Sequence, residues 1–277
     1  MLGIGDTHRR FSVMGNSQRA RRETPLGSAF AYLRTMLVFI AAWWAVSMWT
    51  SNPVLLPSPF AVIAAFVELA GDFELFKHAG ISLGRMVLSL GLAALLALPL
   101  GLFMGLSRWF DALVDPVVEL LRPISGIAWI PLALFIFGIG NALPVFIMTY
   151  AAFFPIVLGT IAGVRSVDRR LVDAARTMGI PDRTIVNRVV VPAALPSILV
   201  AVRLGVASSW TAVVAAELIG APSGLGYAVE WYRELLMTPQ VMAFIATIGV
   251  LGYLSDRSLR MLAQRFTPWA SDASTAP

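Results

Sequence analysis

The residues that could do chemistry in this sequence are few, and the charged ones among them interrupt long apolar runs. Arg203 and Glu217 lie in one apolar run, and Arg85 lies in another. A charged side chain inside a membrane span is costly, so it either serves a solute path or belongs to a structural ion pair. Both roles remain open for Arg203 and Glu217, whereas Arg85 is expected to face protein or water.

Uncharged polar residues extend this candidate path. Ser208 and Thr211 are three residues apart and therefore share a helix face, whereas Trp210 cannot point in the same direction. Ser125 and Trp129 lie in a proline-interrupted run and complete the set. For Trp129, packing in the core is favoured over contact with a solute.

The sequence gives little support for an enzyme. His8 lies in a polar N-terminal stretch and His78 at the edge of an apolar run, so neither joins a metal cluster or a nucleophile–base pair. The chain has no cysteine, and no Gly-x-x-x-x-Gly-Lys-Ser/Thr phosphate loop occurs in it. We therefore expect no catalytic residue, no metal and no cofactor in this chain.

A basic stretch between two apolar blocks is the other notable feature. Its pattern predicts a short helix over Leu171–Met178, a bend at Gly179 and a second helix restarting at Pro181. Six arginines lie between positions 165 and 188, and basic loops of membrane proteins face the cytoplasm. The stretch ends at Pro192, where the next apolar block begins.

This stretch resembles the coupling loop in permease subunits of bacterial ABC importers. That loop has Glu-Ala-Ala, a glycine four residues after the last alanine, and a hydrophobic-x-hydrophobic-Pro ending. The matching positions are Asp173, Ala174, Ala175, Gly179, Val189, Val191 and Pro192. The departure is Asp173, where the family usually has Glu. The resemblance implies that Asp173, Ala174, Ala175, Gly179 and Pro192 couple the chain to a separate ATPase subunit.

The resemblance extends from about Leu55 to Trp269 and is strongest to the nitrate, sulfonate, taurine and bicarbonate branch. Motifs such as Trp129-Ile-Pro-Leu and Ala215-Ala-Glu-Leu-Ile219 carry it, and the ending Arg265-Phe-Thr-Pro-Trp269 is most similar to taurine and sulfonate members. The implied substrate is taurine or another sulfonate, with nitrate, bicarbonate or a pyrimidine or aromatic nutrient as alternatives. For an anion path, we expect Glu217 to be paired rather than to contact the substrate directly.

The family also implies an assembly and a location. A homodimer of this chain would work with two ATPase subunits, which bind ATP and Mg, and with a periplasmic substrate-binding protein. The fold would be that of a type I ABC importer permease in the bacterial inner membrane. An ion-gradient-driven secondary transporter is the rival, and it would need an ion relay and often inverted repeats. Stimulation by ATP through a partner separates the two.

Composition agrees with a membrane protein. Hydrophobic residues make up 58% of the 277, charged residues only 13%, and the mean hydropathy is +0.77; a soluble domain carries about 25% charged residues. The pI of about 10.2 could suggest nucleic-acid binding. However, the basic residues lie between the apolar runs, which indicates loop topology and membrane lipid as the contact rather than nucleic acid.

Spacing predicts an all-α protein with six transmembrane helices and both termini in the cytoplasm. The expected spans are Ala29–Trp49, Gly80–Leu106, Pro116–Phe137, Pro144–Gly163, Ala193–Ile219 and Val241–Leu262. With this topology, 17 of the 21 Lys and Arg residues lie on the inner side and two on the outer side. The inner loop 107–115 is expected to be a short turn, and Pro123 and Pro131 are expected to break the third span.

The domain organisation follows from these spans. We expect residues 1–28 to form a mobile cytoplasmic tail, 29–266 the transmembrane permease domain with the coupling loop at 165–192, and 267–277 a C-terminal tail. Ser58 and Pro59 predict the start of a short external helix. Gly101 and Gly105 predict a close approach of another helix.

Overall fold

The computed structural model describes residues 25–50 and 52–269. The expected tails at 1–28 and 267–277 therefore lie largely outside the described residues. Residues 1–46 and 47–277 form two compact units, and each is considered by itself. The first unit contains most of helix α1, Pro25–Thr50, whose 26 residues enclose the expected first span.

Long apolar helices dominate the second unit. Among the described residues, four helices are long and apolar enough to cross a membrane: α3 (Glu74–Leu106), α6 (Ala142–Arg165), a continuous helix over Asp182–Gly220, and α11 (Thr238–Phe266). They lie at the second, fourth, fifth and sixth expected spans, and a bent pair at the third would make five. The all-α class is confirmed, whereas the count of six and the side of the termini stay predictions.

The region around the third span differs from the expectation. Residues 107–115 are not a turn, because α4 (Arg108–Leu121) begins directly after Ser107, whose Oγ accepts a hydrogen bond from the Phe110 amide at 3.3 Å. A 3₁₀ turn, η1 (Gly126–Trp129), and α5 (Ile130–Phe137) follow, bent by 80° from α4. The chain breaks near Pro123 as expected, but Pro131 stands in the first turn of α5, a position that suits proline.

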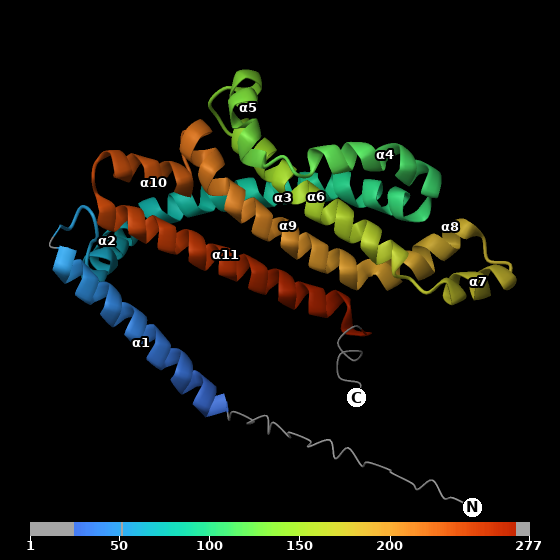
Figure 1. Ribbon diagram of the computed structural model, residues 1–277, viewed down its shortest axis with the longest axis horizontal. Coiled ribbons are helices and arrows are strands. Elements are labelled where there is room, and N and C mark those ends of the chain that lie inside the picture. The colour runs from blue at the N-terminus through green and yellow to red at the C-terminus, as the bar shows by residue number, and fades with distance from the viewer. Residues whose placement is uncertain (1–24, 51, 270–277) are drawn as a thin grey trace, which may run out of the picture. The chain divides into compact units, whose positions relative to one another are not determined.

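The core of this unit is the layer formed by α3, α6 and α9 (Val191–Gly220), with α6 in contact with both others (Figure 1). Small residues permit the close contact. A methyl group at Gly101 would lie 2.7 Å from Cβ of Thr160, and one at Gly105 would lie 2.7 Å from Cβ of Val164. The expected close approach at these two glycines is confirmed, with α6 as the partner helix.

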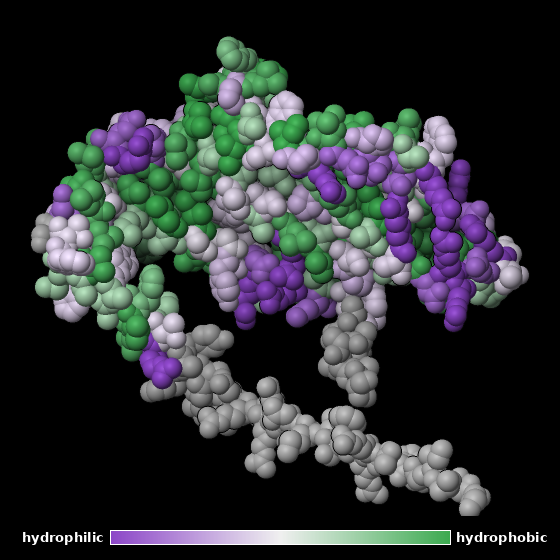
Figure 2. All heavy atoms as spheres, in the orientation of Figure 1, coloured by the Kyte–Doolittle hydropathy of each residue, from purple (hydrophilic) through white to green (hydrophobic). Residues whose placement is uncertain are grey.

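Shorter helices cover the ends of this layer. Helix α2 (Pro59–Gly71) packs against α11, and its expected cap is confirmed because Ser58 Oγ accepts a hydrogen bond from the Ala61 amide. Helix α10 (Leu225–Glu234) follows the loop after α9. At the opposite end lie α7 (Arg169–Thr177), α8 (Asp182–Ile185) and a π-helical turn, η2 (Val186–Val190), where hydrophilic surface gathers (Figure 2).

Candidate functional site

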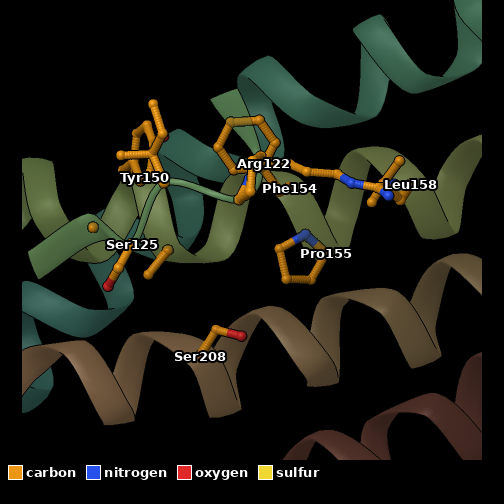
Figure 3. Close-up of a pocket in the computed structure, with 11 residues that line it drawn as sticks. Arg122, Ser125, Tyr150, Phe154, Pro155, Leu158 and Ser208 are labelled. Atoms are coloured by element: carbon orange, nitrogen blue, oxygen red, sulfur yellow. The ribbon is translucent and has the colours of Figure 1, made fainter. Parts of the chain in front are cut away.

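A hollow of about 480 Å³ lies where the bend after α4 meets α6 and α9 (Figure 3). Ser125 lines it from the bend and Ser208 from α9, while Pro155 contributes from α6. A second hollow of about 220 Å³ shares Ser125 and Ser208 and adds Thr211. The structure thus brings together Ser125, Ser208 and Thr211 from segments far apart in the chain.

The helix break shapes this hollow. The Tyr150 hydroxyl of α6 donates a hydrogen bond of 2.7 Å to the carbonyl of Leu121. That carbonyl lies at the end of α4, where a helix leaves acceptors without an intrahelical partner. Tyr150 also packs its ring against Trp129, with ring centroids 5.9 Å apart. Trp129 therefore supports the wall rather than lining the hollow, as its expected packing role requires.

The lining has a distinct chemistry. It combines the guanidinium of Arg122 with the hydroxyls of Ser125 and Ser208, and no carboxylate is among its lining residues. Ser125 Oγ accepts a weak bond from the Ile127 amide at 3.4 Å. Hydroxyl donors and one cation in an otherwise apolar wall can hold a small anion.

Glu217 lies elsewhere, in a buried network between α3 and α9. It is fully buried and pairs with Arg85 at 2.7 Å. It also accepts hydrogen bonds from the Ser82 hydroxyl, at 2.7 and 2.9 Å, and from the Gly226 amide at 3.0 Å. The expectation that Glu217 is paired is confirmed, and so is the expectation that Arg85 faces protein.

The rest of this network was not foreseen. Arg85 also donates to Oδ1 of Asn141, at 2.6 and 3.1 Å, and to the carbonyl of Ser223 at 2.6 Å. His78 accepts a hydrogen bond from the Gly224 amide through Nδ1. The only sequence signal was the pair of opposite charges in two apolar runs, because Asn141, Ser223 and Gly224 are ordinary loop residues.

Two further candidates for the solute path, Arg203 and Trp210, do not line either hollow. Arg203 pairs with Asp256 of α11 at 2.8 Å, and this pair is partly exposed. Trp210 is buried in the apolar cluster that includes Val206 and Phe244. Of the seven residues considered for a path, three therefore line the two hollows, and four do not.

The coupling segment, residues 165–192, has the expected helix–bend–helix form. Gly179 has a φ of +75°, a conformation that favours glycine, and its amide bonds to the carbonyl of Arg176 as α7 ends. Asp168 caps α7 by accepting from the Arg170 amide at 2.9 Å. Helix α7 thus begins at Arg169, two residues before the expected start.

Within this segment the matched residues differ in exposure. Asp173 and Ala174 are exposed, whereas Ala175 is buried against the helices behind it. Arg176 and Asp182 form an ion pair across the bend at 3.1 Å. Pro192 lies in the first turn of α9, and α8, η2 and α9 continue as one helix. The bend is therefore attached directly to the helix that carries Ser208 and Thr211.

A final polar contact fixes α10. The Tyr232 hydroxyl donates to Oε2 of Glu74, in the first turn of α3, at 2.6 Å. Burial raises the pKa of the Tyr232 hydroxyl, and the bond to Glu74 raises it further. The phenol thus stays protonated over the physiological range and keeps donating this bond.

Comparison with known proteins gives a consistent result. Residues 97–268 match the family described as "Binding-protein-dependent transport system inner membrane component". The chain is 36% identical over 261 residues to the taurine transport system permease protein TauC of Escherichia coli, covering 92% of this chain and 95% of that protein. It is 32% identical over 262 residues to the putative aliphatic sulfonates transport permease protein SsuC of Bacillus subtilis, covering 93% and 95%.

More distant relatives extend the picture. The bicarbonate transport system permease protein CmpB of Synechococcus elongatus is 30% identical over 243 residues, covering 83% of this chain and 86% of that protein. A solved structure of the MetNI methionine ABC transporter in an inward-facing conformation is similar in fold, with a TM-score of 0.61 and 21% identity. That match covers 69% of this chain and 94% of the other.

Proposed function

Because this chain belongs to the family of binding-protein-dependent transport system inner membrane components and is an ABC transporter permease subunit, we propose that it conducts a sulfonate of the taurine class in an ATP-driven importer. The observation that carries the proposal is the lining of the hollow: Ser125, Ser208 and Arg122 without a carboxylate. A sulfonate presents three acceptor oxygens and one negative charge, which suits hydroxyl donors and a guanidinium.

The relatives support this choice of substrate. TauC and SsuC are named for taurine and aliphatic sulfonates, and CmpB for bicarbonate, which is also an oxyanion. Nitrate and bicarbonate therefore remain the second candidates, since the same lining could bind them. The ion-gradient alternative is set aside, because the family consists of ABC transport components.

The coupling segment supports the proposed assembly. Exposed Asp173 and Ala174, together with the bend at Gly179, form the surface that we assign to an ATPase subunit, which would bind ATP and Mg. A second copy of this chain, a second ATPase subunit and a periplasmic binding protein would complete the importer in the bacterial inner membrane. Motion at the bend would reach Ser208 along the continuous helix over Asp182–Gly220.

The test is ATP hydrolysis by the complex co-purified with its ATPase and binding protein. We expect taurine or an alkanesulfonate to stimulate hydrolysis only when the binding protein is present, and nitrate, bicarbonate and pyrimidines to do so weakly. Stimulation by a pyrimidine alone would reject an anion path. Stimulation by bicarbonate or nitrate alone would support an anion path but reject a sulfonate as the substrate.

A variant tests the hollow itself. Ser208→Leu places a larger apolar side chain at its wall, so solute uptake should fall roughly tenfold or more, since a hydroxyl of the lining is lost and the space is filled. The matched control is Ser258→Leu, at an exposed position of α11 outside the hollows. Normal uptake by Ser208→Leu, with the protein inserted as before, would contradict the assignment.

A further inference from the structure

A larger cavity, of about 830 Å³, lies at the opposite end of the helical layer from α10. It is enclosed by the end of α3, the start of α4, the end of α6 and the coupling segment. None of its lining residues lines the two hollows assigned to the solute. The proposed transport path therefore gives this cavity no role.

The residues that line the cavity fall into an apolar group and a charged group, termed its apolar side and its charged side. Its apolar side includes the buried residues Met104, Val164, Ile185 and Val190. Its charged side consists of Arg108, Asp111, Arg165, Arg169, Arg176 and Asp182. Such a division suits a ligand that has a charged group joined to an apolar body.

The charges of this side do not balance. Four arginines face two aspartates, so the lining carries a formal charge of +2. Asp111 forms an ion pair with Arg165 at 2.5 Å, and Asp182 forms one with Arg176 at 3.1 Å. Arg108 and Arg169 form no ion pair with a described residue, so two guanidinium groups are left for an anion. Arginine is suited to phosphate because its planar donors bind two oxygens at once.

The position of the cavity at the ends of two helices that could span a membrane suits a lipid headgroup. Helix α3 ends at Leu106 and α6 at Arg165, and both are long and apolar enough to span a membrane. Trp109, next to Arg108, is 75% exposed, and tryptophan is enriched at the boundary between membrane and water. A ligand in this cavity would therefore be within reach of the surrounding bilayer.

We propose that the cavity binds the phosphate headgroup of an anionic phospholipid, with Arg108 and Arg169 on the phosphate and the glycerol region against the apolar side. The excess of arginine at this end places it in the cytoplasmic leaflet. Because Arg108 begins α4 and Arg169 begins α7, the bound lipid joins the transmembrane helices to the coupling segment. Anionic lipid is thereby a structural ligand of the segment that we assign to the ATPase.

The experiment compares two pairs of substitutions that remove the same charge. The site pair is Arg108→Gln with Arg169→Gln, and the control pair is Arg183→Gln with Arg188→Gln, exposed arginines of the same end that do not line the cavity. The full chain, purified with the partners that accompany it, is titrated with phosphatidylglycerol or phosphatidylcholine, and bound lipid is counted by native mass spectrometry. Inorganic phosphate is a third arm.

We expect phosphatidylglycerol to bind in preference to phosphatidylcholine, the site pair to weaken that binding roughly thirtyfold, and the control pair to change it little. Equal weakening by both pairs would overturn the proposal, since the lipid would then follow net charge alone. Saturation by inorganic phosphate that displaces the lipid would reject a lipid ligand in favour of a free anion. Loss of lipid whenever the ATPase is attached would assign the cavity to that partner instead.

These results are independent of the solute. Lipid binding is read by mass and not by ATP hydrolysis, so failure of the sulfonate proposal would leave this outcome unaffected. A chain that transports taurine but binds no phosphatidylglycerol would reject the lipid site alone.

Discussion

At the scale of single residues, Glu217 illustrates why a charge inside the membrane need not serve the solute. Its carboxylate accepts hydrogen bonds from Arg85, the Ser82 hydroxyl and the Gly226 amide, and it is fully buried away from the two hollows. A buried pair of this kind costs desolvation when it forms, and removing one partner strands the other charge. The pair thus fixes the loop after α9 against α3.

This network predicts a large effect from one substitution. Glu217→Ala should lower the free energy of unfolding by about 3–5 kcal/mol, because Arg85 would stay buried without its counter-ion. Asp256→Ala breaks the partly exposed pairs with Arg203 and Arg260 and should cost about 1 kcal/mol or less. Thermal unfolding of both variants in detergent makes the comparison. Equal losses would show that burial does not decide the strength of these pairs.

At the scale of elements, the bend between α7 and α8 requires glycine at position 179 because of its backbone conformation, and not because a side chain would lack space there. No atom lies within 4 Å of a methyl group placed on Gly179, yet its φ of +75° is unfavourable for other residues. The sequence predicted this bend correctly, because glycine between two helical segments is a local signal. The 80° bend between α4 and α5 was only half predicted: Pro123 marks the break, but α4 itself was missed because Ser107 had not been recognised as its cap.

The bend predicts an effect on coupling. Gly179→Leu should reduce association with the ATPase and solute uptake, while membrane insertion remains normal, since the strain is confined to the coupling segment. Gly179→Asn should be milder, because asparagine tolerates positive φ better. Gly80→Ala is the control, since Gly80 also has open space around it but lies within a helix. Pull-down and uptake measure both effects, and full coupling in Gly179→Leu would contradict this role.

At the scale of the whole molecule, the number of spans and their direction define the transporter. Residues 52–269 support four spans, or five with the bent pair, and α1 has the length of another. The distribution of Lys and Arg predicts that both termini and the coupling segment share the cytoplasmic side. An even number of crossings is required for that arrangement.

The absence of cysteine in this sequence allows a clean test of topology. Thr177→Cys in α7 and Gln264→Cys in α11 should react with an impermeant maleimide only after the cells are opened, as should Ser17→Cys in the predicted tail. Asp72→Cys, after α2, should react in intact cells. Labelling of Ser17→Cys in intact cells would place residue 17 on the outer side. The first predicted span would then not cross the membrane, and five spans would remain.

The sequence by itself determined the membrane class, four of the helical spans of the second unit and the bend at Gly179. These features arise from local signals: hydrophobic length, proline and glycine positions, and the count of basic residues. Only the tertiary structure decided which polar side chains meet. Ser82 and Glu217 are 135 residues apart, and Ser125 and Ser208 come from different elements. A periodic pattern records whether a side chain is buried, but the identity of its partner is set by how distant helices pack.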